Sequence, residues 1–250
     1  MNEFGIAVLV FLCLLAASLG SLLIRERLPP HQRQDDTHAV VGLVANVFVV
    51  MTSLVLGLML NSAKTTFEGV DRNVHAIATD LILLERTLQR YGPDADQTRQ
   101  RLLTYVRRAA SSIRHDDPLV ADRTSERLLN DVGDSLRAIQ PVGAEQMSLW
   151  NDARQQFHRI VELRWVIVEQ SDGTIPMPLI GMMVAWLMLI FGSFGYRAPK
   201  NAVVVTSFVL STALIAGTIY LILDMDVPFT GPIQVSPAPL QRAAVEMQQQ

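Results

Sequence analysis

"AVVGLVANVFVVMTSLVLGLML" spans Ala39–Leu60 and contains no Asp, Glu, Lys, Arg or His. Its length matches the roughly 20 apolar residues that a helix needs to cross a bilayer. The next stretch, "NSAKTTFEGVDRNVHAIATDLILLERTLQRY" (Asn61–Tyr91), is mostly polar. Residues 61–66, where the two stretches meet, include neither Gly nor Pro. We therefore predict one continuous helix from Ala39 to Tyr91, about 80 Å long at 1.5 Å per residue.

The polar half of this helix keeps a regular apolar pattern. Its apolar residues recur in alternating steps of three and four, which is the heptad spacing of helices that pack lengthwise. They are Phe67, Val70, Val74, Ile77, Leu81, Leu84, Leu88 and Tyr91. A helix that leaves the membrane with such a seam must bury it against other helices.

Three further blocks, Phe4–Ile24, Met177–Phe194 and Ala202–Leu223, also lack charged residues and histidine. Each is long enough to cross a bilayer as a helix. We therefore predict an all-α protein with four transmembrane helices and a helical extramembrane bundle inserted between the second and third spans.

The expected domains follow from the positions of these blocks. They are residues 1–60 (spans one and two), 61–173 (the bundle), 174–223 (spans three and four) and 224–250 (a C-terminal tail). Within the bundle, Gly92-Pro93 ends the long helix, because proline cannot continue it. Further helices are expected after Asp96, up to Ile139, and over Ala144–Gln170.

The basic residues of the short links predict the orientation. Arg25, Arg27 and Arg33 follow the first span, and Arg197 and Lys200 follow the third, whereas the amino terminus carries no Lys or Arg. By the positive-inside rule, both links lie in the cytoplasm and the bundle lies outside.

Three segments resemble one known family. They are "GLMLNSAKTTFEGVDRNVHAIATDLILLE" (residues 57–85), "FGYRAPKNAVVV" (residues 194–205) and "DMDVPFTG" (residues 224–231). Together they resemble the bacterial bestrophin-like family DUF4239, and the resemblance covers nearly the whole chain.

The resemblance implies similarity to bestrophins, which are pentameric anion channels with four spans per subunit and a cytosolic helical domain. It also implies a place in the bacterial inner (plasma) membrane, and it conflicts with the outside bundle that the basic residues predict. Two features depart from bestrophins. Phe48 is the one aromatic residue of the second span, where bestrophins have an aromatic pore neck, and Asp116-Asp117 is only a pair where they have a dense acidic calcium clasp.

The second span carries a polar stripe, defined as Asn46, Ser53, Gly57, Asn61 and Lys64. Their spacing places them, together with Val50, on one helix face. One interpretation is a water-filled pore with Lys64 at its mouth favouring anions. The other is close helix packing through small and polar residues.

The tail motif is a second candidate site. Asp224 and Asp226 end the last span, and Pro228, Phe229 and Gly231 follow. A carboxylate at the C-terminus of a helix is disfavoured by the helix dipole. We therefore expect it to find a partner, either a cation or an Arg of the bundle, and expect the Pro-Phe-x-Gly segment to turn the tail against the membrane surface. Arg164, on the apolar seam of the fourth bundle helix, is likewise expected to pair with an acid.

The sequence contains no GxSxG, HExxH or Gly-rich phosphate loop and no His or Cys pair with metal-ligand spacing. We therefore expect no enzyme activity, no cofactor and no metal, and no charge run indicates nucleic acid. The expected partners are the lipid bilayer, further copies of the chain in a homo-oligomer, and inorganic ions. Two functions stay open: an oligomeric ion channel, or a non-conducting sensor or scaffold whose bundle binds a ligand or a partner protein.

Overall fold

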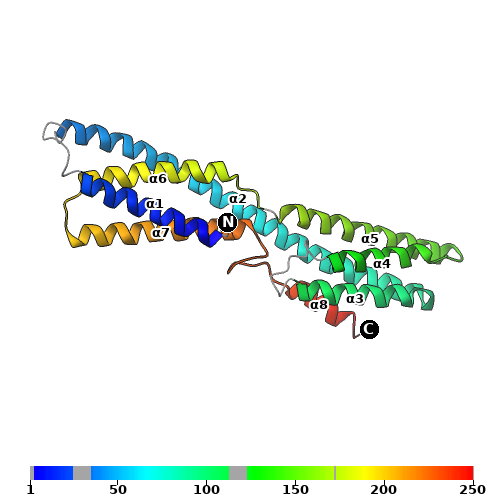
Figure 1. Cartoon of the computed structure of the whole chain (residues 1–250). Coiled ribbons are helices and arrows are strands. Elements are labelled where there is room, and N and C mark those ends of the chain that lie inside the picture. The colour runs from blue at the N-terminus through cyan, green and yellow to red at the C-terminus, as the bar shows by residue number, and fades with distance from the viewer. Residues whose placement is uncertain (1–2, 25–34, 113–122, 172, 250) are drawn as a thin grey trace. The chain divides into compact units, whose positions relative to one another are not determined.

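The computed structural model describes residues 3–24, 35–112, 123–171 and 173–249, and every regular element in these ranges is helical (Figure 1). The helices are α1 (Glu3–Ile24), α2 (Asp35–Tyr91), the 3-10 turn η3 (Pro93–Ala95), α3 (Asp96–Ser112), α4 (Arg123–Ala138), α5 (Ala144–Gln170), α6 (Met177–Arg197), α7 (Ala202–Asp226) and α8 (Ala238–Glu246). The predicted all-α class is confirmed. Arg25, Arg27, Arg33 and the Asp116-Asp117 pair lie outside the described residues.

Helix α2 is a single helix of 57 residues that passes through residues 61–66 without interruption. The predicted continuity of the membrane-like and polar halves is therefore confirmed. The helix ends where expected, at Tyr91, and Gly92 takes a positive φ of 104° just before Pro93. A left-handed residue followed by proline is a common way to stop a helix.

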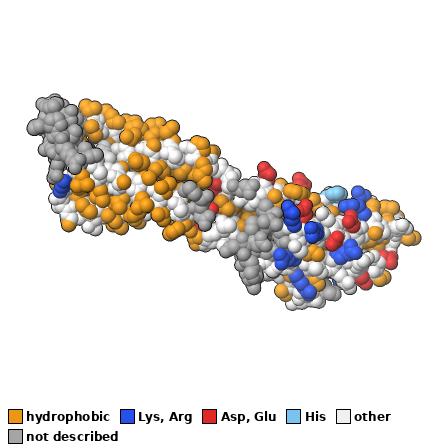
Figure 2. All heavy atoms as spheres, in the orientation of Figure 1, with side chains coloured by type: hydrophobic (Ala, Val, Ile, Leu, Met, Phe, Trp, Pro, Cys, Tyr) orange, Lys and Arg blue, Asp and Glu red, His pale blue; other side chains and the backbone are white. Residues whose placement is uncertain are grey.

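The chain divides into two compact units. Unit 1 comprises Met1–Lys64 and Thr174–Asp226, and unit 2 comprises Thr65–Gly173 and Val227–Gln250. Among the described residues, four helices are long and apolar enough to cross a membrane: α1, α2, α6 and α7. In the view of Figure 2, the surface of unit 1 is mainly hydrophobic, whereas unit 2 exposes many Lys, Arg, Asp and Glu side chains.

In unit 1, α1 packs against α6 and α7, and the backbones of α1 and α6 approach each other closely at Gly195. A Cβ at this position would collide with the backbone oxygen of Ser18 and the hydroxyl of Ser21. Glycine is therefore required here because the two backbones approach each other, as in other closely packed transmembrane helices. The core of unit 1 is apolar, with Leu14, Met183 and Ile219 fully enclosed.

In unit 2, the heptad seam of α2 forms one wall of the core. The seam residues from Val70 to Tyr91 are buried, and Phe67 is partly buried. They pack with apolar residues of α3, α4 and α5, among them Leu102, Leu136 and Ile160. The predicted bundle of helices around the seam is thus present.

The tail differs from the prediction. Residues 227–250, expected as a separate tail, belong to unit 2, and Phe229 is 4% exposed within its core. The tail also contains helix α8, which the sequence analysis did not predict. Leu240, Ala243 and Ala244 of α8 and Met247 directly after it are buried and recur at the helical spacing of i, i+3, i+4 and i+7.

The start of α6 is bound to the end of α7 within unit 1 by Asp226. The backbone N–H groups of Thr174 and Ile175 donate to Asp226 Oδ2 at 2.8 and 3.0 Å, and the Thr174 hydroxyl donates to Oδ1 at 2.8 Å. Asp226 is 4% exposed. Among the described residues, the partners of this carboxylate are these N–H and O–H donors and not an Arg of the bundle. Hydrogen bonds from N–H and O–H groups satisfy a buried carboxylate without a cation.

We predict that Gly195→Leu lowers the free energy of unfolding by about 1–3 kcal/mol, the usual cost of overpacking. Gly181→Leu is the matched control, because a Cβ at Gly181 on the same helix meets no atom within 4 Å. Thermal unfolding of both variants in the same detergent measures the difference. Equal melting temperatures would contradict a close backbone approach at Gly195.

We predict that Asp226→Ala costs about 1.5–3 kcal/mol of stability, because it removes hydrogen bonds to a charged acceptor and leaves buried donors unpaired. Asp226→Asn should cost less, since its amide oxygen still accepts. Asp134→Ala on α4 is the control, because the Asp134 side chain is 67% exposed. Thermal unfolding is again the measurement, and an Asp226→Ala variant as stable as the control would refute this role.

Candidate functional site

The polar stripe of α2 lies on the exposed side of the helix. Asn46, Ser53, Gly57, Asn61 and Lys64 are all exposed in the chain. The face of α2 that packs within unit 1 is a different one, formed by Gly42, Ala45, Thr52, Met59 and Ala63. The structure therefore brings the five stripe residues onto one surface and does not use them to pack helices of the same chain.

This exposure matters because the stripe belongs to a candidate membrane span. Polar side chains facing lipid are unfavourable, and those within a span usually face a water-filled cavity or another helix. The Ser53 hydroxyl donates to the Val49 carbonyl of its own helix at 2.8 Å, which lowers its cost in lipid. The Asn46 amide has no such local hydrogen bond among the described residues.

The exposed surface of α2 also carries large apolar residues beside the stripe. Leu43, Val47, Leu54 and Leu58 are each more than half exposed. Residues of this type suit contact with lipid or with other apolar helices. The stripe is therefore a narrow polar band on an otherwise apolar surface.

The tail motif is divided between the two units. Asp224 and Asp226 are buried in unit 1, whereas Pro228 and Phe229 are buried in unit 2. The expected turn is present: the Val235 N–H donates to the Pro228 carbonyl at 2.9 Å, and Gly231 has a positive φ of 79°. The hydrogen bonds of the motif join backbone groups within the turn, and those of Asp226 link the end of α7 to the segment before α6. Thr174 could not be predicted as a partner of Asp226, because its position just before a span gives no signal of a contact 52 residues away.

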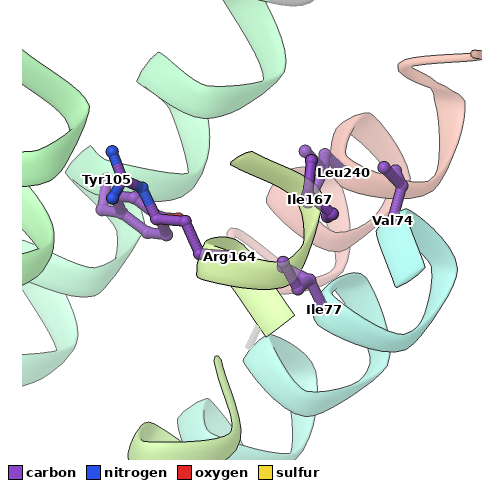
Figure 3. Close-up of a pocket in the computed structure, with 6 residues that line it drawn as sticks. All are labelled: Val74, Ile77, Tyr105, Arg164, Ile167 and Leu240. Carbon is purple, nitrogen blue, oxygen red and sulfur yellow. The ribbon is translucent and has the colours of Figure 1, made fainter. Parts of the chain in front are cut away.

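Arg164 on α5 is 5% exposed, and its Nε atom is buried without a hydrogen-bond partner. No ion pair of Arg164 is found among the described residues, so the expected partner acid is not observed. Its guanidinium carbon lies 5.9 Å from the centre of the Trp165 ring. Figure 3 shows its side chain extending toward Tyr105 of α3, away from the cluster of Val74, Ile167 and Leu240.

Tyr105 is 1% exposed and was also missed, although it follows Leu102 by three residues on the buried face of α3. Burial raises the pKa of the Tyr105 phenol to about 12, and the nearby Arg164 charge lowers it by less. The phenol is therefore neutral at physiological pH.

Within the described part of the chain, no group of three or more His, Cys, Asp or Glu side chains is placed to hold a metal ion. On α2, the Nδ1 atom of His75 lies 2.9 Å from the Asp71 carbonyl oxygen, and the Thr79 hydroxyl donates to the His75 carbonyl at 3.0 Å.

Comparison with known proteins identifies the fold and the family of the chain. The chain has the same fold as a bacterial bestrophin homolog from Klebsiella pneumoniae, crystallised as single-residue variants. One variant gives a TM-score of 0.65 at 9% identity over 97% of both chains, and another gives 0.63 at 11% identity over 100% of this chain and 98% of the other. A crystal structure described as a membrane protein variant also matches, with a TM-score of 0.65 at 10% identity over 97% of each chain.

A search among curated proteins finds no match. The model of the Bestrophin-like domain matches residues 12–240, which include the C-terminal part of the first candidate span, the other three spans and residues 61–173 of the bundle. The chain therefore belongs to the bestrophin-like family.

Proposed function

We propose that this protein is an oligomeric ion channel of the bacterial inner (plasma) membrane, with the polar stripe of α2 lining the pore. The observation that carries the proposal is the exposure of all five stripe residues on a candidate membrane span. A polar band in a bilayer needs water or a polar partner beside it. A ring of copies that turn this band toward a common axis supplies water in the pore and polar side chains from the neighbouring copies.

Membership of the bestrophin-like family supports the same proposal, because the family resemblance implies channel activity and several subunits around one pore. Symmetric homo-oligomers are the usual way in which identical subunits close a ring. Close packing within the subunit, the other interpretation of the stripe, has less support because its five residues are exposed in the chain. Packing between copies without a pore is the remaining competitor.

Lys64 gives the proposed pore a charge preference. Residues 39–60 contain no charged side chain, so Lys64 is the first charge after the apolar block. A ring of lysines at the mouth of a pore raises the local concentration of anions and repels cations. We therefore propose inorganic anions as the permeant class.

The proposed orientation follows the positive-inside rule, with the bundle outside. The tail belongs to the same unit as the bundle, so a reporter fused after Gln250 samples the same compartment. A reporter that is active only in the cytoplasm should be silent there. Activity of this reporter would place the bundle inside, as the family resemblance implies.

We predict that the purified protein conducts in planar bilayers, and that Lys64→Glu changes its preference from anions toward cations by several-fold. Asn61→Leu should lower the conductance, because it replaces a polar side chain of the stripe by an apolar one. The reversal potential in a chloride gradient measures the selectivity.

Thr218→Val is the matched control for these variants. Thr218 is an exposed polar residue of a candidate span, but its hydroxyl donates to the Leu214 carbonyl of its own helix at 2.9 Å. The control should conduct like the wild type. Silent bilayers over a range of voltage, pH and calcium would contradict the channel and favour a non-conducting scaffold.

A further inference from the structure

A groove lies between α1 and α7 in unit 1, and no residue of the polar stripe lines it. Its volume is about 340 Å³. Four residues of α1, from Phe4 to Phe11, and four residues of α7, from Ala213 to Tyr220, form its walls. On each helix these residues recur at the spacing i, i+3, i+4 and i+7, so one face of each helix lines the groove.

Small residues leave the space that forms the groove. Ala7 and Ala216 are buried at its floor, and a Cβ added to Gly217 would meet no atom within 4 Å. Phe4 and Val8 stand at its rim, where they are 68% and 41% exposed. Both helices are candidate membrane spans. The groove therefore presents an almost wholly apolar lining to the hydrocarbon of the bilayer.

One end of the groove is polar and lies at the boundary of the spans. The rings of Phe4 and Tyr220 are 6.3 Å apart in a T-shaped pair, which places the start of α1 beside the end of α7 (Figure 1). The charges of Glu3 and Asp224 act on Tyr220, so both carboxylates lie near this end. Among the described residues, Glu3 has no ion pair and the Tyr220 hydroxyl has no hydrogen bond. This end therefore offers an unpaired carboxylate and a free hydroxyl.

The size of the groove favours a hydrocarbon chain over a helix of a second copy. The groove runs about 10 Å along α1 from Phe4 to Phe11, at 1.5 Å per residue. A helix about 10 Å across fills about 800 Å³ over this length, which is more than twice the volume of the groove. An extended hydrocarbon chain is much narrower than a helix and fits between the two walls.

We propose that the groove binds one phospholipid with an ammonium headgroup, of the phosphatidylethanolamine type. One acyl chain lies over Ala7 and Gly217, the Tyr220 hydroxyl donates to an ester or phosphate oxygen, and the Glu3 carboxylate binds the ammonium group. The chain supplies the van der Waals contacts that the small residues leave unmade. Glu3 and Asp224 disfavour an anionic headgroup at the same place. The site rests on the candidate spans and does not depend on conduction.

Native mass spectrometry of the full-length protein tests the headgroup. It counts the phospholipids retained per chain after equal exposure to phosphatidylethanolamine or phosphatidylglycerol with the same acyl chains. The wild type should retain phosphatidylethanolamine about two- to five-fold more strongly, the range of a partly exposed ion pair. Glu3→Gln should lose this preference, whereas Glu145→Gln, at an exposed position of α5, should keep it. Equal retention of both lipids by the wild type, or an unchanged preference in Glu3→Gln, would overturn the proposal.

The same measurement tests the groove itself with Gly217→Leu. The added side chain enters the open space and should abolish most of the retention of phosphatidylethanolamine. Gly181→Leu on α6 is the matched control, because a Cβ there also meets no atom within 4 Å and Gly181 does not line the groove. This control should retain the lipid like the wild type. Equal retention by the two leucine variants would overturn the proposal.

A second measurement needs no variant and decides the matter if the substituted chains do not fold. The structure of the wild type in phosphatidylethanolamine nanodiscs should show elongated density between α1 and α7, with its polar end at Glu3 and Tyr220. An empty groove, or a helix of a second copy in it, would overturn the proposal.

Discussion

The structure depends on one constraint, which is that a helix inside a bilayer must satisfy its own backbone and shield its polar side chains. Helix α2 meets the first requirement along its whole length, since it is unbroken from Asp35 to Tyr91. It meets the second only in part. One face, with Gly42, Ala45 and Met59, packs within unit 1, while the polar stripe stays exposed. The proposed oligomer is the arrangement that completes the requirement.

The same helix organises unit 2 by a different rule. Here water satisfies the polar side chains, and the apolar seam needs cover instead. Residues of α3, α4 and α5 supply it, together with Phe229 and Leu240 from the tail. The tail therefore belongs to the core of this unit, although its prolines and polar residues resemble those of a loop. In the interior created this way, the Nε atom of Arg164 is buried without a hydrogen-bond partner.

Much of the fold could be predicted because its signals are local. The absence of Gly and Pro at residues 61–66 predicted the continuity of α2, and Gly143 and Ser171 border a helix with the predicted limits Ala144–Gln170. Helix α8 was missed because Pro237 and Pro239 suggest a loop, although proline is well tolerated in the first turn of a helix. The stripe was found from its spacing alone. Its exposure could not be predicted, since spacing does not say which face of α2 packs within unit 1.

The partners of Asp226 and Arg164 could not be predicted either, because the sequence does not say which distant groups lie beside a buried side chain. Asp226 is bound by backbone N–H groups, which every residue carries and no sequence pattern marks. Arg164 was expected to meet an acid, yet the acids of the bundle pair with arginines that lie closer to the surface, such as Arg86 and Arg159. Pairing near the surface avoids the desolvation of two charges, which a pair at Arg164 would have to overcome.

Cysteine accessibility along α2 tests the central claim most directly. In a Cys13→Ala background, single cysteines at Asn46, Ser53 and Gly57 are treated in intact membranes with a charged, membrane-impermeant thiol reagent, alongside cysteines at Leu54 and Leu58. The account predicts modification at the three stripe positions and none at the two leucines, because only the stripe faces water. Protection of the stripe positions, or equal reaction at all five, would contradict a water-filled pore along this face of α2.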